Sequence, residues 1–241
     1  FGLHWQRAAK EGGAGLLCFD DLGEATFAAD LVVNQNPGAQ DLSYDMEDGH
    51  VLAGADYVVL RRDIRRLKRQ APSTQPHLLV TFGGYDAGNL ALATMKELTR
   101  LETPFTATVI CTAGDRGLKE AKNFAASQSE TFRVLPPSDI VPLMAAVDLA
   151  LCAGGTTALE LASLGVPMVL VTVADNQEPG AAALAVAGCA RLAGYGVAAL
   201  GAASKFVDDL LCDSATREKM NRAGITLVDG RGVARICKAM Q

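Results

Sequence analysis

Short apolar runs alternate with longer segments of mixed polarity along most of the chain. The runs are apolar at nearly every position, which is typical of strands buried on both faces of a parallel sheet; they lie at residues 77–82, 106–112, 131–135, 149–153 and 168–173. The segments between them have the length and composition of helices, at 89–99, 117–127, 140–147 and 157–164. This alternation implies right-handed crossovers and predicts a doubly wound α/β fold.

A proline-rich break at residues 71–76, "APSTQP", interrupts the alternation and is the best candidate for a linker. We therefore expect residues 77–241 to form one complete Rossmann-like domain. Its part from Gln177 onward is predicted to be mostly helical, with a turn at Gly194-Tyr195-Gly196.

Residues 1–71 contain three short apolar runs, at 16–19, 30–33 and 57–60, which we interpret as strands. Three short strands are too few to form a domain that is stable on its own. We interpret this part as the C-terminal part of an N-terminal Rossmann-like domain. The opening "FGLHWQ" resembles the inside of a longer chain, and we expect residues ahead of Phe1.

The composition is that of a globular protein, with 49% hydrophobic and 20% charged residues. The net charge of −5 argues against a nucleic-acid partner, and the basic cluster Arg61–Arg69 fits one solvated helix face. No apolar run reaches the roughly 20 residues of a membrane span. Scattered cysteines without a Cys-x-x-Cys pair favour a reducing, cytoplasmic location.

Nothing in the sequence predicts a metal or a cofactor. The three histidines have no ligand spacing to one another. No Gly-Lys-Ser/Thr follows any glycine pair, and no G-x-G-x-x-G is present, which disfavours ATP and NAD.

The segment 152–162, "CAGGTTALELA", carries the strongest candidate chemistry. Ligands of open parallel sheets bind beyond the carboxyl ends of the strands, where Gly154 and Gly155 lie. Glycines let a phosphate approach the backbone, and the helix predicted at 157–164 offers free N–H groups and the positive end of its dipole. The competing interpretation is a capping box, in which Thr157 caps the helix and Glu160 stands at its third position.

Two further loops follow predicted strands and raise the same choice between ligand binding and local structure. Gly83 and Gly84 permit either a close approach to phosphate or an ordinary turn. Asp175, Asn176 and Gln177 offer donors and acceptors for a sugar, although an aspartate there equally suits a helix N-cap. No nucleophile motif and no histidine lies in these loops.

Three segments in this order resemble one family: "LLVTFGGYDAGN", "DLALCAGGTTALELASLGVPMVLVTVADNQ" and "DGRGVARI". They are similar to the C-terminal domain of the UDP-sugar hydrolases of pseudaminic acid biosynthesis and to related spore-coat polysaccharide proteins. The resemblance continues through "LCFDDLGEATFAADLVVNQNPGA" upstream. It implies the GT-B fold of MurG-type glycosyltransferases, with two Rossmann-like domains of which the first is incomplete at its N-terminus.

The resemblance also implies a function: release of UDP from a diacetamido-trideoxy hexose by water. In such a protein Gly154, Gly155, Thr156 and Thr157 hold the diphosphate, and Glu160 holds the ribose diol. Gly83 and Gly84 approach the diphosphate, backbone near Ile140 reads the uracil, and the sugar side is lined by Tyr85, Asn89, Asp175, Asn176 and Gln177. The ligand is then UDP or a UDP-sugar, with no cofactor.

Three departures from the family pattern bear on catalysis or on the sugar pocket. The family's glycine-rich loop with its catalytic histidine has no match in this chain, so the resemblance assigns no catalytic residue here. Tyr85 stands where a serine is usual, and Phe1-Gly2 stands where a Tyr-Gly is usual. A GT-B glycosyltransferase and a catalytically inactive nucleotide-sugar-binding domain remain alternative interpretations.

Overall fold

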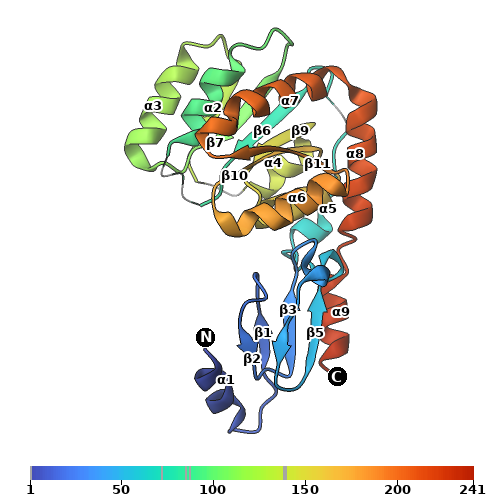
Figure 1. Ribbon diagram of the computed structural model, residues 1–241. Helices are drawn as coiled ribbons and strands as arrows, with labels where there is room; N and C mark the ends of the chain where they lie inside the picture. The colour runs from blue at the N-terminus through green and yellow to red at the C-terminus, as the bar shows by residue number, and fades with distance from the viewer. Residues whose placement is uncertain (1, 72, 85, 87, 138–139) are drawn as a thin grey trace. The chain divides into compact units, whose positions relative to one another are not determined.

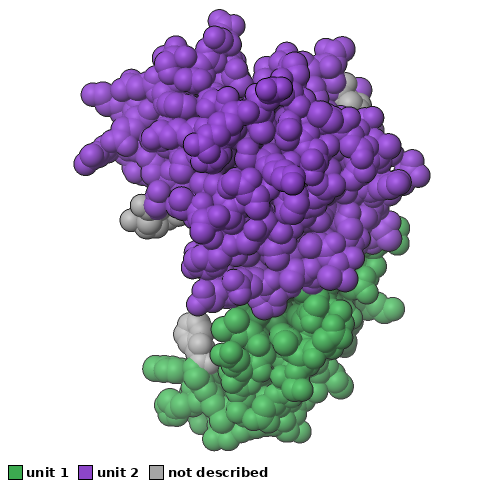
Figure 2. Space-filling model, turned by 45° about the horizontal axis from the view of Figure 1, so that its top comes forward, with its two compact units in different colours: residues 1–61, 228–241 green, residues 62–227 purple. Residues whose placement is uncertain are grey.

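The computed structural model describes residues 2–71, 73–84, 86, 88–137 and 140–241. The chain divides into two compact units, which Figure 2 shows in different colours. Unit 1 consists of Phe1–Arg61 and Val228–Gln241, and unit 2 consists of Arg62–Leu227.

Unit 1 is built on a parallel sheet of three strands in the order β1-β3-β5, beside a separate parallel pair, β2-β4 (Figure 1). Its elements are α1 (Leu3–Lys10), β1 (Leu17–Phe19), β2 (Thr26–Phe27), β3 (Leu31–Asn34), β4 (Asp45–Met46), β5 (His50–Ala53) and α9 (Gly232–Ala239). The prediction of a third strand at residues 57–60 is wrong. That segment follows a 3-10 turn, Ala55–Tyr57, and the third strand of the sheet is β5.

The two units differ from the predicted domains, 1–71 and 77–241, at both boundaries. The C-terminal helix α9 belongs to unit 1, where Ile236 packs against Leu31 and Val33 of β3. The segment after Arg61 is tied to unit 2, since the Gln70 N–H donates to the Ala145 carbonyl at 2.8 Å. Both boundaries are therefore decided by tertiary contacts that a local pattern does not contain.

The basic segment Arg61–Arg69 does not form the predicted helix face. Its regular structure is a single 3-10 turn, Ile64–Arg66, whose Ile64 is buried. Arg69 is half-buried, and its guanidinium donates to the carbonyls of Val147, at 3.2 Å, and of Gly165. Burial lowers the pKa of Arg69.

Unit 2 contains one six-stranded parallel sheet in the order β11-β10-β9-β6-β7-β8. The strands are β6 (His77–Thr81), β7 (Thr106–Ile110), β8 (Phe132–Leu135), β9 (Leu149–Cys152), β10 (Met168–Thr172) and β11 (Ala190–Tyr195). The helices are α2 (Leu90–Leu98), α3 (Gly114–Ala126), α4 (Val141–Ala146), α5 (Thr156–Ser163), α6 (Glu178–Val186), α7 (Leu200–Cys212) and α8 (Ser214–Leu227). This is the doubly wound strand order, and it confirms the predicted α/β, Rossmann-like fold.

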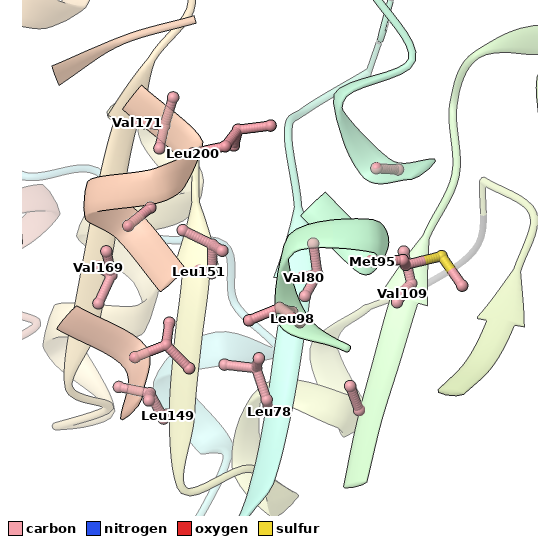
Figure 3. Packing of buried hydrophobic residues seen from close by; sticks show 14 of the residues in the cluster. Leu78, Val80, Met95, Leu98, Val109, Leu149, Leu151, Val169, Val171 and Leu200 are labelled. Atoms are coloured by element: carbon pink, nitrogen blue, oxygen red, sulfur yellow. The ribbon is translucent and has the colours of Figure 1, made fainter. Parts of the chain in front are cut away.

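The strands of this sheet are apolar on consecutive positions because both of their faces are covered. β9 and β10 are buried at every residue. On one face, side chains of β6, β7, β9 and β10 pack against α2 and α7, as Figure 3 shows for Leu78, Val80, Met95, Leu98, Val109, Leu149, Leu151, Val169, Val171 and Leu200. This core fixes where the strand ends, and hence the loops, lie.

Strand β11 was not expected from the sequence. Residues 190–195 were predicted to be helical with a turn at the end, but they pair with β10 along its whole length. The segment is rich in alanine and contains no β-branched residue, so its local propensity does not favour a strand. Pairing with the exposed edge of β10 overrides that preference.

None of the helices in the described part of the chain has the length and apolarity that a membrane crossing requires.

Candidate functional site

The two glycine pairs leave the sheet side by side. Thr81 at the end of β6 pairs with Cys152 at the end of β9, and the Ala153 N–H donates to the Thr81 carbonyl at 3.2 Å. Gly83–Gly84 and Gly154–Gly155 therefore start from neighbouring positions. They flank the point where the strand order reverses, which is where ligands bind in sheets of this topology.

The loop after β6 borders open space. Gly83 has φ +89°, a conformation that side chains other than glycine rarely adopt. A Cβ atom at Gly83 or Gly84 would have no described atom within 4 Å. The Thr112 hydroxyl donates a hydrogen bond to the Gly83 carbonyl at 3.0 Å. No described side chain therefore covers the backbone at Gly83 and Gly84, where a ligand can approach it.

Asp86 caps the start of α2 from a position three residues before the N-cap residue, Asn89. Its buried carboxylate accepts the N–H groups of Leu90, at 2.7 Å, and Ala91, at 2.9 Å. This role of Asp86 was not predicted, because the usual cap signal is an acidic residue directly before the helix and Asp86 precedes Leu90 by four residues.

Asn89 and the predicted sugar-side residues Asp175–Gln177 lie on opposite sides of β6. It has a left-handed backbone, φ +49°, and its amide lies beside Gly117 of α3, on the β7 side of β6. Its Oδ1 atom is buried, with no hydrogen-bond partner among the described residues. Asp175 and its neighbours follow β10, on the other side of β6. Tyr85, the remaining predicted sugar-side residue, lies outside the described residues.

Helix α5 begins without a side-chain cap. Gly155 occupies the N-cap position, so Thr156 and Thr157 are the first two helical residues. The capping-box interpretation is therefore wrong, because Thr157 is not the cap and Glu160 is not at the third position. Glu160 is 5% exposed and lies one turn after Thr156, on the same face of α5.

The loop after β10 packs directly on the glycine loop of β9. A Cβ atom at Gly154 would come within 2.9 Å of the Ala181 Cβ and 3.5 Å of the Gln177 Cβ. A Cβ atom at Gly155 would lie 3.7 Å from the Gln177 Nε2 atom. The absence of a side chain at Gly154 is thus required by packing against α6, whatever ligand the loop holds.

Gln177 is oriented by the strand that precedes it. Its Oε1 atom accepts the Val173 N–H at 3.0 Å, so its amide group faces Gly155. Asp175 and Asn176 are exposed in the short 3-10 helix Asp175–Gln177. The N-cap interpretation of Asp175 is wrong, because Ala174 holds that position and no side chain caps the turn.

Ile140 precedes α4, and its carbonyl accepts the Met144 N–H at 3.0 Å. It follows β8, which β7 separates from β6. The Leu135 carbonyl is engaged in the sheet by the Cys111 N–H at 2.9 Å. Ser138, in the same loop, lies outside the described residues.

The described residues contain no cluster of three or more histidine, cysteine or acidic side chains able to hold a metal. His77 is the histidine that falls in unit 2, and it stands at the opposite, amino-terminal end of β6. Its ring nitrogens lie 2.7 Å from the Thr106 Oγ1 and 3.0 Å from the Thr108 Oγ1. Burial lowers the pKa of His77. His77 therefore has a structural role between β6 and β7 and is too far along β6 to act on a ligand at the glycine loops.

The strand order, the parallel sheet and the glycine loops at the reversal point define a Rossmann-like α/β protein with a candidate ligand site at that point. The family model described as "Glycosyltransferase family 28 C-terminal domain" matches residues 77–228. The chain belongs to this family, and the matched region runs from β6 to the end of α8.

Comparison with individual proteins agrees with this fold. The chain is similar to the crystal structure of MurG from Acinetobacter baumannii, with a TM-score of 0.65 and 20% identity, covering 96% of this chain and 67% of that one. It is also similar to UDP-GlcNAc 2-epimerase from Neisseria meningitidis bound to UDP-GlcNAc, with a TM-score of 0.50 and 17% identity, covering 69% of this chain and 44% of that one.

Among curated proteins, the chain is 27% identical over 155 residues to "Uncharacterized protein MJ1062" of Methanocaldococcus jannaschii. The match covers 59% of this chain and 32% of that protein, so the chain spans about a third of the length of this relative.

Proposed function

We propose that unit 2 binds a UDP-sugar at the carboxyl edge of its sheet, between the ends of β6 and β9. The observation that carries this proposal is the adjacency of the two glycine loops, fixed by the pairing of Thr81 with Cys152. The first N–H groups of α5 have no intrahelical acceptor and form the positive end of the helix dipole. The diphosphate lies on these groups and against the Gly83–Gly84 backbone.

Each remaining predicted residue has a role in this proposal. Glu160 accepts the two ribose hydroxyls, while Thr156 and Thr157 donate to the diphosphate. The Gln177 amide, which faces Gly155, donates toward the phosphate and sugar. Exposed Asp175 and Asn176 line the sugar. The backbone at Ile140 reads the uracil edge, and the sequence resemblance implies a sugar-side role for Tyr85 and Asn89.

We further propose that the reaction is hydrolysis of a UDP-linked diacetamido-trideoxy hexose, of the UDP-2,4-diacetamido-2,4,6-trideoxy-β-L-altropyranose type. A water oxygen bonds to the anomeric carbon as the bond from that carbon to the phosphate oxygen breaks. UDP leaves with the electron pair, and a general base takes the water proton. The helix N-terminus stabilises the charge developing on the leaving diphosphate. The sequence resemblance to the UDP-sugar hydrolases supports the choice of water, and a cytoplasmic location belongs to the same proposal.

Glycosyl transfer is the second candidate, and membership in a glycosyltransferase family favours it. The nucleotide-sugar site is the same, and a hydroxyl group of an acceptor replaces water. The neighbour bound to UDP-GlcNAc supports the shared element of both candidates, a UDP-sugar on this fold.

Calorimetric titration of the chain with UDP and GDP tests the binding proposal. We expect UDP to bind, GDP to bind more weakly, and Glu160→Gln to lose about tenfold in affinity for UDP through loss of a charge-assisted hydrogen bond. Glu178→Gln, an exposed change in the first turn of α6, is the matched control and retains affinity. Absence of UDP binding, with Glu160→Gln lowering only the melting temperature, contradicts the proposal.

A separate assay distinguishes water from another acceptor. The chain is incubated with the UDP-sugar in ¹⁸O-labelled water, and the released sugar is analysed by mass spectrometry. Hydrolysis places the label on the anomeric oxygen without any added acceptor. Release of UDP only when an acceptor alcohol is added supports the transferase instead.

A further inference from the structure

Strand β11 carries a bulge at Ala193, two residues before the strand ends at Tyr195. Met168–Leu170 of β10 pair with Ala190–Leu192 of β11, after which Val171 pairs with Gly194 and Thr172 with Tyr195. Ala193 is passed over in this ladder. Because side chains alternate along a strand, passing over one residue moves every later side chain to the other face.

The bulge therefore decides the face on which Tyr195 lies. Val169 and Val171 of β10 belong to the core under α7, together with Leu200. Thr172 faces the opposite side, and Tyr195, its partner in a parallel ladder, shares that side. In an unbroken ladder Tyr195 would instead share the α7 face with Arg191, whose guanidinium lies 5.4 Å from the Phe206 ring.

The face that Tyr195 reaches is the one that carries the candidate site. Helix α6 packs there against β10 and β11, on the side of the sheet opposite α7 (Figure 1). The Tyr195 hydroxyl lies 3.4 Å from the Val173 carbonyl, to which it donates. Val173 is also the residue whose N–H binds Gln177. The ring is thus anchored beside the loop 175–177, while 48% of Tyr195 stays exposed.

Two glycines in unusual conformations hold this arrangement. Gly194 has φ +125° and Gly196 has φ +58°, both in the region that other residues rarely adopt. A Cβ atom at Gly196 would meet no atom of the described residues within 4 Å, so none of those residues packs against this position. The Gly196 N–H donates to the Thr172 carbonyl at 2.9 Å and closes the ladder. Bulges of this kind commonly redirect a side chain next to a binding site.

We infer that Tyr195 is a specificity-determining residue that packs its ring against the hexose of the bound nucleotide sugar. This inference rests on the proposed function. Two strand spacings, about 10 Å, separate β9 from β11, which matches the reach from a diphosphate on α5 across one sugar ring. The C–H face of a hexose carries partial positive charge and suits the negative face of an aromatic ring.

The test compares UDP with UDP-N-acetylglucosamine in titrations of the chain and two variants of Tyr195. Tyr195→Ala is expected to keep its affinity for UDP and to lose about fivefold for the UDP-sugar, the range of one ring contact. Tyr195→Phe keeps the ring and is expected to bind both ligands as the parent does. Val197→Ala, an exposed apolar change two residues further on, is the control and changes neither affinity.

The outcomes separate this inference from the proposed function. If the parent chain binds no UDP, the proposed function and this inference both fail. If it binds UDP but Tyr195→Ala weakens both ligands equally or neither, the nucleotide site stands and the role of Tyr195 is refuted. Thermal unfolding of each variant shows whether the fold is retained, and loss of affinity for UDP together with a lowered melting temperature also refutes the role.

Discussion

Gly154 and Ala181 touch so closely that a Cβ atom on the glycine would lie 2.9 Å from the Ala181 Cβ. Through this contact the first turn of α6 packs against the loop that precedes α5. The glycine that brings a backbone near the proposed diphosphate is therefore also a packing requirement, and substitution there changes stability as well as binding.

The first prediction follows from this contact. Gly154→Ala forces two methyl groups into one space and is expected to lower the free energy of unfolding by about 1–3 kcal/mol, the usual cost of overpacking. Gly201→Ala, at an exposed position of α7 where an added Cβ atom meets no described atom within 4 Å, is the control. Urea unfolding measures both variants. An equal loss in the two would show that α6 does not hold Gly154 as described.

The second prediction concerns Asp86, which caps α2 through the N–H groups of Leu90 and Ala91. Asp86→Ala leaves both groups without this acceptor and is expected to cost about 1–2 kcal/mol of stability. Asp115→Ala removes an exposed acid from the first turn of α3 and is expected to cost less. Thermal unfolding with far-ultraviolet circular dichroism compares them. A smaller effect at Asp86 than at Asp115 would contradict the cap.

The third prediction is a dependence of stability on pH through His77. Burial lowers its pKa in the folded protein below the ordinary value of 6.5, with Asp148 opposing and Arg133 reinforcing the shift. The unfolded chain therefore takes up a proton first as the pH falls, so the free energy of unfolding decreases below about pH 6.5.

His77→Gln cannot titrate, and we expect its stability to fall less than that of the parent between pH 7.5 and pH 5.5. Urea unfolding at several pH values gives the free energy of unfolding of both chains. The difference between the two chains removes the contributions of the other titrating groups, which both chains share. Parallel curves for the two chains would exclude a lowered pKa at His77.

The fourth prediction separates the two roles of Gln177. Gln177→Glu keeps an oxygen for the Val173 N–H but replaces the amide donor near Gly155 with negative charge. We expect the melting temperature to be nearly unchanged and the affinity for UDP to fall by more than about tenfold. Asn176→Asp adds the same charge one residue earlier, in an exposed position, and is expected to weaken UDP less. Equal losses in calorimetric titrations would indicate a general charge effect and no specific donor.

The amino-acid sequence by itself determined the elements of the unit 2 sheet from β6 to β10. These strands are largely apolar at consecutive positions, most fully in β9 and β10, which are covered on both faces, and each was predicted within a few residues. The glycine pairs and the loop 175–177 were likewise recognised, since Gly and Asp-Asn-Gln clusters stand out against the runs that precede them.

The tertiary structure decided what these local patterns could not. The sequence does not state that β9 lies next to β6, and only this pairing brings Gly83–Gly84 beside Gly154–Gly155. The local pattern at Thr157 and Glu160 fitted a capping box, but packing started α5 at Thr156. Strand β11 and the return of α9 to unit 1 depend on an open sheet edge and on β3, both far away along the chain. A local sequence pattern does not predict these features, because the interactions that stabilise them are made with residues far away along the chain.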